Sequence, residues 1–298
     1  MGYDKALWVE EQGKGKGKGK GKEGEKEETE EPSVSFSHRS PAGDQGYPGE
    51  LDVRVRYTWS DKNELGIKLT AELVAEDNDS AAAATTSTVV NLTNHTYFNL
   101  GNGGDARVDV PSTHRLRLRC PSFLPVDETQ IPTGEVKPVK GSAMDFYNAP
   151  RSSNPAAAFE AWSGRLLGKR LSEVDGGGKP GYDHCFCREG WEAGVKEEGA
   201  AAAAAGSAAS CTREVAEIAR LENFISGRVL RVLTNQDGVQ VYTGNWMDGE
   251  GVHGQHGGVA LECQRFPDAP NKEGTFPSAV LRAGEVYENE IVYAFGVM

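Results

Sequence analysis

Two ionisable side chains lie in stretches that also contain apolar residues. His95 lies within the decapeptide NLTNHTYFNL, and Glu262 lies within the apolar run Val259–Cys263. An imidazole, with an ordinary pKa near ~6.5, gives or takes a proton close to neutral pH, and burial raises the pKa of a carboxyl group into the same range. The two residues therefore indicate general acid–base chemistry. A polar turn at His95 and a hydrogen-bonded structural glutamate at 262 are the alternatives that the residues leave open.

Alternation of apolar and polar residues predicts the strands that would position these groups. The clearest run is Leu51–Trp59, and the turn-prone residues 60–63 lead to a second run that ends at Leu73, so we expect a hairpin. The Asp237-Gly238 pair predicts another hairpin, which sends residues 239–243 back along the preceding strand. A short helix is predicted at Ala156–Val174. Further strands are predicted at 115–120, 214–221, 228–234 and 285–295. Many short strands with little helix indicate an all-β antiparallel sandwich.

Three arginines, Arg115, Arg117 and Arg119, alternate with apolar residues in one predicted strand. They could form a clamp for a sugar or a phosphate. Their regular alternation favours a solvated outer face instead.

Low-complexity segments interrupt the strand pattern. Residues 13–31 alternate glycine and lysine before turning to glutamate, 77–88 are rich in alanine, serine and threonine, and 194–210 contain a run of six alanines. We expect these to be loops, with 13–31 and 194–210 disordered, inside a single domain that spans residues 1–298. The net charge of −12 argues against a nucleic-acid partner. The absence of a long apolar stretch and of a signal peptide predicts a soluble cytoplasmic protein without a membrane partner.

The five cysteines of the chain, an odd number, fit reduced thiols better than a disulfide framework. His253 and His256 could be combined with Cys185 and Cys187 into a zinc site. Cys-x-Cys and His-x-x-His without a second well-spaced pair are weak metal signals, so we expect no metal and no cofactor.

The decapeptide Asn91–Leu100 resembles the signature of the aldose 1-epimerase (galactose mutarotase) family. Six further blocks agree with that family in the same order: Gly2–Trp8, Ser40–Leu51, Leu124–Val136, Gly181–Phe186, Gly238–Gly249 and Leu261–Asn271. The resemblance implies a galactose mutarotase-like supersandwich of two sheets with a sugar cleft on a concave face. It also implies interconversion of the α and β anomers of free hexoses such as galactose and glucose, without a metal or cofactor.

Taken residue by residue, the resemblance implies that Glu262 is the general base and His95 the general acid towards the ring oxygen, on opposite sides of the sugar. It implies that the substrate is bound by Thr96, Tyr97, Asp183 and Gln240. Trp246 either offers its apolar face to the pyranose or packs within the protein.

Members of the family carry about a further quarter of chain before the block Gly2–Trp8, including an Asn-Arg pair and a His-Gly-Gly that contact the sugar. We expect this N-terminal portion to be missing, so that the fold is truncated and the cleft incomplete around an intact acid–base pair. Two alternatives therefore stay open: a non-catalytic or weakly active carbohydrate-binding paralogue, and a hexose-6-phosphate 1-epimerase relative. We expect a monomer or a weak dimer.

Overall fold

A computed structural model describes residues 2–11, 31–74, 87–101, 109–147, 164–192, 213–247 and 253–298. Within these ranges the chain forms a nine-stranded sheet, a six-stranded sheet and a two-stranded ribbon, all antiparallel, with one short α-helix and four 3-10 helices. We call the nine-stranded sheet the large sheet and the six-stranded one the small sheet. The prediction of an all-β antiparallel sandwich is confirmed.

The strands of the large sheet, in spatial order, are β1 (Val9–Glu11), β2 (Ser33–Ser40), β3 (Leu51–Ser60), β4 (Glu64–Leu73), β17 (Val286–Val297), β13 (Arg228–Thr234), β12 (Ala216–Asn223), β7 (His114–Leu118) and β10 (Arg165–Leu166). Those of the small sheet are β6 (Tyr97–Phe98), β15 (Val259–Gln264), β14 (Gly238–Tyr242), β11 (Asp183–Cys187), β8 (Ser122–Phe123) and β9 (Lys137–Pro138). The ribbon pairs β16 (Val280–Arg282) with β5 (Ser87–Val89). The helical elements are η1 (Tyr3–Lys5), η2 (Asp44–Gly46), α1 (Val110–Thr113), η3 (Leu167–Glu173) and η4 (Ala269–Asn271).

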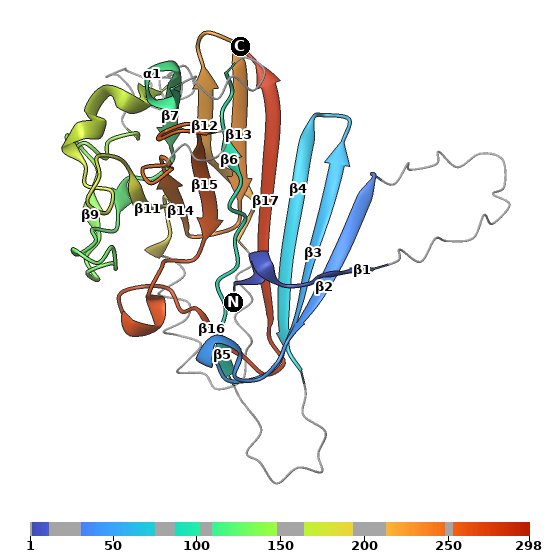
Figure 1. The fold of residues 1–298 in the computed structure, drawn as a ribbon. Coiled ribbons are helices and arrows are strands. Elements are labelled where there is room, and N and C mark those ends of the chain that lie inside the picture. Colours follow the sequence, from blue (N-terminus) through green and yellow to red (C-terminus); the bar gives the residue numbers. More distant parts are fainter. Residues whose placement is uncertain are drawn as a thin grey trace, which may run out of the picture.

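The small sheet packs against one part of the large sheet, and strands β2, β3 and β4 extend beyond it (Figure 1). Alternation explains the packing, because every second side chain of a strand points to the same face. Val239 and Val241 of β14 and Leu261 of β15 are completely buried, in one cluster with residues of the large sheet such as Leu118 and Leu221. The residues between them, including Gln240 and Glu262, therefore point to the opposite face of the small sheet.

The hairpin predicted from the first alternating run is confirmed. Strand β3 pairs with β4 along its whole length, from Leu51 opposite Leu73 to Ser60 opposite Glu64. Asn63 closes the turn with a positive φ of 58°, a conformation that asparagine adopts more readily than most residues.

The second predicted hairpin is wrong. Strand β14 does not return along β13; it pairs with β11 and β15 in the small sheet. Both edges of β13 are already occupied, by β12 and β17. The turn instead carries the chain from the large sheet, which contains β13, to the small sheet, which contains β14. Within it Asp237 is buried and forms an ion pair with Arg213 at 2.7 Å.

The prediction that the three alternating arginines lie on a solvated outer face is also wrong for the central one, Arg117. Arg117 is 1% exposed, and its Nη2 lies 2.7 Å from Oε1 of Glu217 on the neighbouring strand β12. Strand β7 is covered on both faces at this point, and the ion pair compensates the buried charge.

The helix predicted at Ala156–Val174 does not form in the described part of that range, which begins at residue 164. Gly164 has a φ of +93°, Arg165–Leu166 pair with the edge of β7, and η3 is a 3-10 helix interrupted by non-helical dihedrals at Arg170. The open edge of β7 therefore competes successfully with local helix propensity.

Several predictions fall on residues outside the described ranges: the disordered segments 13–31 and 194–210 in most of their length, and all of loop 77–88 except its last two residues, which belong to β5. Four cysteines of the described part, Cys120, Cys185, Cys187 and Cys263, are buried and free. In the same ranges no helix has the length and apolar character needed to cross a bilayer.

Candidate active site

Neighbouring strands of the small sheet bring three polar side chains together on its outer face. Gln240 on β14 lies opposite Glu262 on β15, and Asp183 begins the adjoining strand β11. The Nε2 group of Gln240 donates a hydrogen bond to Oδ1 of Asp183 at 2.7 Å. The Oε1 atom of Gln240 is buried and has no hydrogen-bond partner among the described residues. This orphaned acceptor is suited to a ligand hydroxyl group.

His95 reaches the same face from a different segment. Its Nε2 atom lies 3.4 Å from Oε1 of Glu262, and 52% of its side chain is exposed, against 11% for Glu262. The base candidate is thus almost enclosed, while half of the acid candidate's side chain is exposed to solvent.

The segment that carries His95 is a strand only at Tyr97–Phe98, where β6 pairs with β15. Before Tyr97, hydrogen bonds from side chains take the place of backbone pairing between strands. Asn91 accepts from the backbone N–H of Arg265 at 2.9 Å and donates to its carbonyl at 3.0 Å. Thr93 donates from Oγ1 to the carbonyl of Cys263 at 2.9 Å. The polar residues of the decapeptide therefore fix the chain against β15 as well as facing the site.

Aromatic rings surround the imidazole. The ring centroid of Tyr97 lies 5.0 Å from that of His95, and the ring of Tyr242 lies 6.5 Å from His95 and 6.1 Å from Tyr97. Burial, with the charges of neighbouring groups, raises the pKa of Tyr97 to about 12, so its phenol keeps its proton at neutral pH. The two tyrosines offer apolar rings and hydroxyl groups to a bound molecule.

Burial raises the pKa of Glu262 to about 7. A positive charge on His95 acts in the opposite direction, and the negative charge of Asp183 adds to the increase. The pKa of Asp183 is itself raised by burial, against the lowering effect of the hydrogen bond from Gln240. A carboxyl group with a pKa near 7 takes up and releases a proton at neutral pH with little cost either way.

The structure thus brings together five of the six predicted site residues: His95, Tyr97, Asp183, Gln240 and Glu262. Thr96 adjoins His95, with its backbone N–H donating to Oδ1 of Asn94 at 3.1 Å and its side chain exposed. His95 and Glu262 are in contact, which differs from the expectation that they lie on opposite sides of a sugar. Trp246 is 56% exposed, its backbone N–H donates to the hydroxyl of Tyr242, and Lys179 covers its ring.

Sequence reasoning missed the residues of β17 that hold the His95 segment, chiefly Tyr287 and Asn289. Asn289 could have been found from the sequence, because it occupies an inward position of β17 where the pattern otherwise places apolar residues. An asparagine at such a position indicates a buried amide that needs hydrogen-bond partners.

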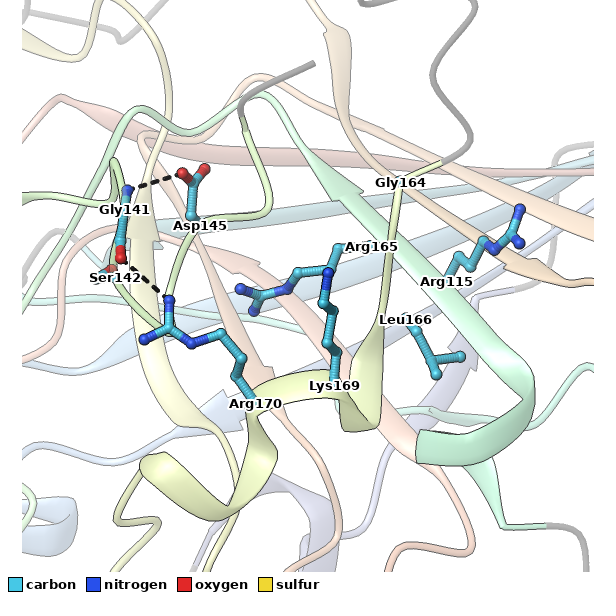
Figure 2. Close-up of a pocket in the computed structure, with 9 residues that line it drawn as sticks. All are labelled: Arg115, Gly141, Ser142, Asp145, Gly164, Arg165, Leu166, Lys169 and Arg170. Carbon is cyan, nitrogen blue, oxygen red and sulfur yellow. Dashed lines mark hydrogen bonds between the residues drawn. The ribbon is translucent and has the colours of Figure 1, made fainter. Parts of the chain in front are cut away.

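A separate cavity of about 500 Å³ lies beside η3, lined by residues other than those of the candidate site (Figure 2). Two of its basic groups, Arg165 and Arg170, are engaged within the protein. Arg165 stacks over the ring of Phe146 at 4.0 Å and donates to the hydroxyl of Tyr182, and Arg170 pairs with Glu173 at 2.6 Å. The acid–base pair, not this cavity, is therefore the candidate active site.

Comparison with known proteins agrees with the fold. The family profile described as aldose 1-epimerase matches residues 15–294. Human galactose mutarotase is 34% identical over 302 residues, which cover 99% of this chain and 67% of the human protein. Aldose 1-epimerase from Haemophilus influenzae is 31% identical, over 91% of this chain and 62% of the bacterial protein.

Solved structures lead to the same family. An aldose epimerase homologue from C. elegans superposes with a TM-score of 0.64 at 25% identity, over 89% of this chain and 66% of that one. Galactose 1-epimerase from Lactobacillus acidophilus gives a TM-score of 0.62 at 23% identity, over 89% of this chain and 63% of that one. The chain spans about two thirds of the length of these relatives.

Proposed function

The chain belongs to the aldose 1-epimerase family, and from this premise we propose that it interconverts the α and β anomers of free aldohexoses, galactose and glucose among them. Glu262 is the general base and His95 the general acid. Relatives that carry the names galactose mutarotase and aldose 1-epimerase support the reaction class and the substrates.

The observation that carries the proposal is the 3.4 Å contact between Nε2 of His95 and Oε1 of Glu262. The two oxygens that exchange protons during ring opening, the anomeric hydroxyl and the ring oxygen, are bonded to the same carbon, C1. Two groups that serve them at hydrogen-bond distance must therefore lie close to each other. A pair in contact fits this requirement.

The proton balance of the reaction suits a pair that shares one proton. Ionised Glu262 removes the proton of the anomeric hydroxyl, protonated His95 gives a proton to the ring oxygen, and the bond between C1 and the ring oxygen breaks. The open-chain aldehyde then turns about C1–C2 and recloses on its other face. During reclosure Glu262 returns its proton to the former carbonyl oxygen, and His95 recovers one from the attacking hydroxyl. The pair ends with the proton count it began with.

Neighbouring groups orient the sugar in this proposal. Asp183 accepts hydrogen bonds from hydroxyl groups, and Gln240 presents the free acceptor Oε1 beside it. Tyr97 lies against His95 and limits the solvent around the reacting carbon. Thr96 lies at the exposed margin of the site and contacts the part of the sugar remote from C1.

Polarimetry of freshly dissolved α-galactose tests the proposal. Glu262→Gln and His95→Asn each remove one proton-transfer group while keeping the shape of the side chain, and we expect each to lower kcat by about 10² to 10⁴-fold. Glu288→Gln and His38→Asn are matched controls, because Glu288 pairs with Lys68 and the ring of His38 packs against Trp8. We expect both controls to retain full activity.

Two outcomes would overturn the assignment. Galactose binding without any acceleration of anomer exchange would select a carbohydrate-binding protein. Activity on glucose 6-phosphate in preference to glucose would select a hexose-6-phosphate epimerase.

A further inference from the structure

Asn289 contacts both the segment that carries His95 and the strand that carries Glu262. It is completely buried on β17, in the large sheet, whereas His95 and Glu262 belong to segments associated with the small sheet. A buried amide in an apolar alternation requires hydrogen-bond partners. The partners of Asn289 are backbone carbonyls of two different segments.

The Nδ2 group of Asn289 donates two hydrogen bonds of equal length. One reaches the carbonyl of Leu92 at 2.8 Å and the other the carbonyl of Cys263 at 2.8 Å. Leu92 precedes His95 by three residues, and Cys263 follows Glu262 directly. A single amide group thus links the segment of the acid to the strand of the base.

Tyr287 and Thr93 complete this clamp. The hydroxyl of Tyr287 accepts from the N–H of Leu92 and donates to its carbonyl, both at 3.0 Å. Thr93 donates to the same Cys263 carbonyl that Asn289 contacts. The segment before Tyr97 lacks ladder pairing, so these side chains, together with Asn91, determine where it lies.

We infer that Asn289 is a positioning residue for the proposed reaction: by bridging the backbone at Leu92 and Cys263, its amide sets the distance between His95 and Glu262. The inference rests on the proposed function. Asn289 faces the core and is completely buried, so it acts through the two segments it joins. A shift of the acid by about 1 Å relative to the base costs up to ~10²-fold in rate.

Three of the residues proposed to bind the sugar are held by strand pairing that does not involve this clamp: Asp183 and Gln240 through β11 and β14, and Tyr97 through the pairing of β6 with β15. Thr96, at the exposed margin of the site, follows the clamped segment. Loss of the clamp therefore lowers kcat and leaves KM nearly unchanged. A variant that merely loosened the fold would lower the amount of active protein without changing the pH dependence of the remainder.

Asn289→Leu, which keeps the approximate size but removes both donors, tests the inference in the full chain. We expect kcat for galactose anomer exchange to fall by about 10- to 100-fold, with KM roughly constant. Ile291→Val is the matched control, since Ile291 is completely buried on the same strand and lies opposite Ile67 of the neighbouring strand β4. We expect its kcat to equal that of the wild type.

Thr93→Val provides a second variant that is only half-buried and so retains the fold. It removes one bond of the clamp, and we expect a smaller loss of kcat with the same constancy of KM. Wild-type kcat in both Asn289→Leu and Thr93→Val, or a rise in KM that accounts for the whole loss, would overturn the inference.

A carboxyl NMR titration of Glu262 separates this inference from the proposed function. Positive charge on His95 lowers the pKa of Glu262, so detaching His95 raises the pKa in Asn289→Leu above its wild-type value. An inactive wild-type protein would refute the proposed function alone. The titration does not depend on turnover, because it measures the effect of the charge of His95 on the pKa of Glu262. An unchanged Glu262 pKa in Asn289→Leu would refute the positioning role whatever the activity.

Discussion

Replacement of Glu262 by glutamine should make the protein more stable, and the gain should grow with pH. Burial raises the pKa of Glu262 from 4.5 to about 7, and its side chain is 11% exposed. A group whose pKa is higher in the folded state contributes stability that is present below its unfolded pKa and is lost as the pH rises through the folded value. Glutamine has no such titration.

The size of the effect follows from the difference between the two pKa values. A shift of one pKa unit corresponds to about 1.4 kcal/mol, so ionisation of Glu262 destabilises the folded state by about 3 kcal/mol above pH 7. The free energy of unfolding of Glu262→Gln, relative to wild type, should therefore rise by about 3 kcal/mol between pH 4 and pH 8. Every other titrating group is present in both proteins, so the difference reports the titration of Glu262 together with its interactions with His95 and Asp183.

Urea unfolding of both proteins at intervals across this range measures the difference, with Glu288→Gln as the control. Glu288 is exposed and pairs with Lys68, and we expect its replacement to change stability by less than about 1 kcal/mol at any pH. A Glu262→Gln difference that stays constant with pH, or that falls as the pH rises, would refute a buried carboxyl group with an elevated pKa.

Three further predictions concern the surroundings of the site. Asp183→Asn removes a negative charge that raises the pKa of Glu262, so the ascending limb of the pH–rate profile should move to lower pH; an unshifted limb would show that the two carboxylates do not interact. Arg117→Met removes one of the two ion pairs of Glu217, which keeps Arg231 at 2.6 Å, and should cost about 1.5–3 kcal/mol in urea unfolding; a loss below about 1 kcal/mol would mean that the pair is solvated. Leu261→Ala empties a fully buried position beside Glu262 and should cost about 2–5 kcal/mol, measured in the same way; a near-neutral result would contradict the close packing between the sheets.

The sheet elements with the most regular alternation were predictable from the sequence. The hairpin of β3 and β4 and the strand β13 follow from period-two patterns and turn residues. The partners of β14 were not predictable in this way, because Asp237-Gly238 encodes a sharp turn and not the sheet to which the next strand belongs. That choice depends on β12 and β17 occupying both sides of β13.

Burial of individual polar residues depends on distant parts of the chain. Arg117 looks like a surface residue in its own strand, and Glu217, a hundred residues later, compensates its buried charge. The clamp at Asn289 is of the same kind, since it joins the residues near 92 and 263.

The candidate site was predictable by residue type and by family resemblance, but its geometry was not. Residue type made His95 and Glu262 candidates for proton transfer, and the resemblance to the family assigned them as acid and base. Their direct contact follows from the way residues 91–96 lie along β15, which no local pattern describes. The roles of these residues stay predictions.

Exchange NMR of galactose at anomeric equilibrium, recorded from pH 5 to pH 9, tests the central claim most directly. If one proton shared by His95 and Glu262 drives the reaction, the enzyme-dependent exchange rate should follow a bell-shaped profile with a limb near pH 7, and Glu262→Gln should lower this rate by at least about 100-fold at every pH. Exchange that is independent of pH, or that keeps its wild-type rate in Glu262→Gln, would contradict the claim.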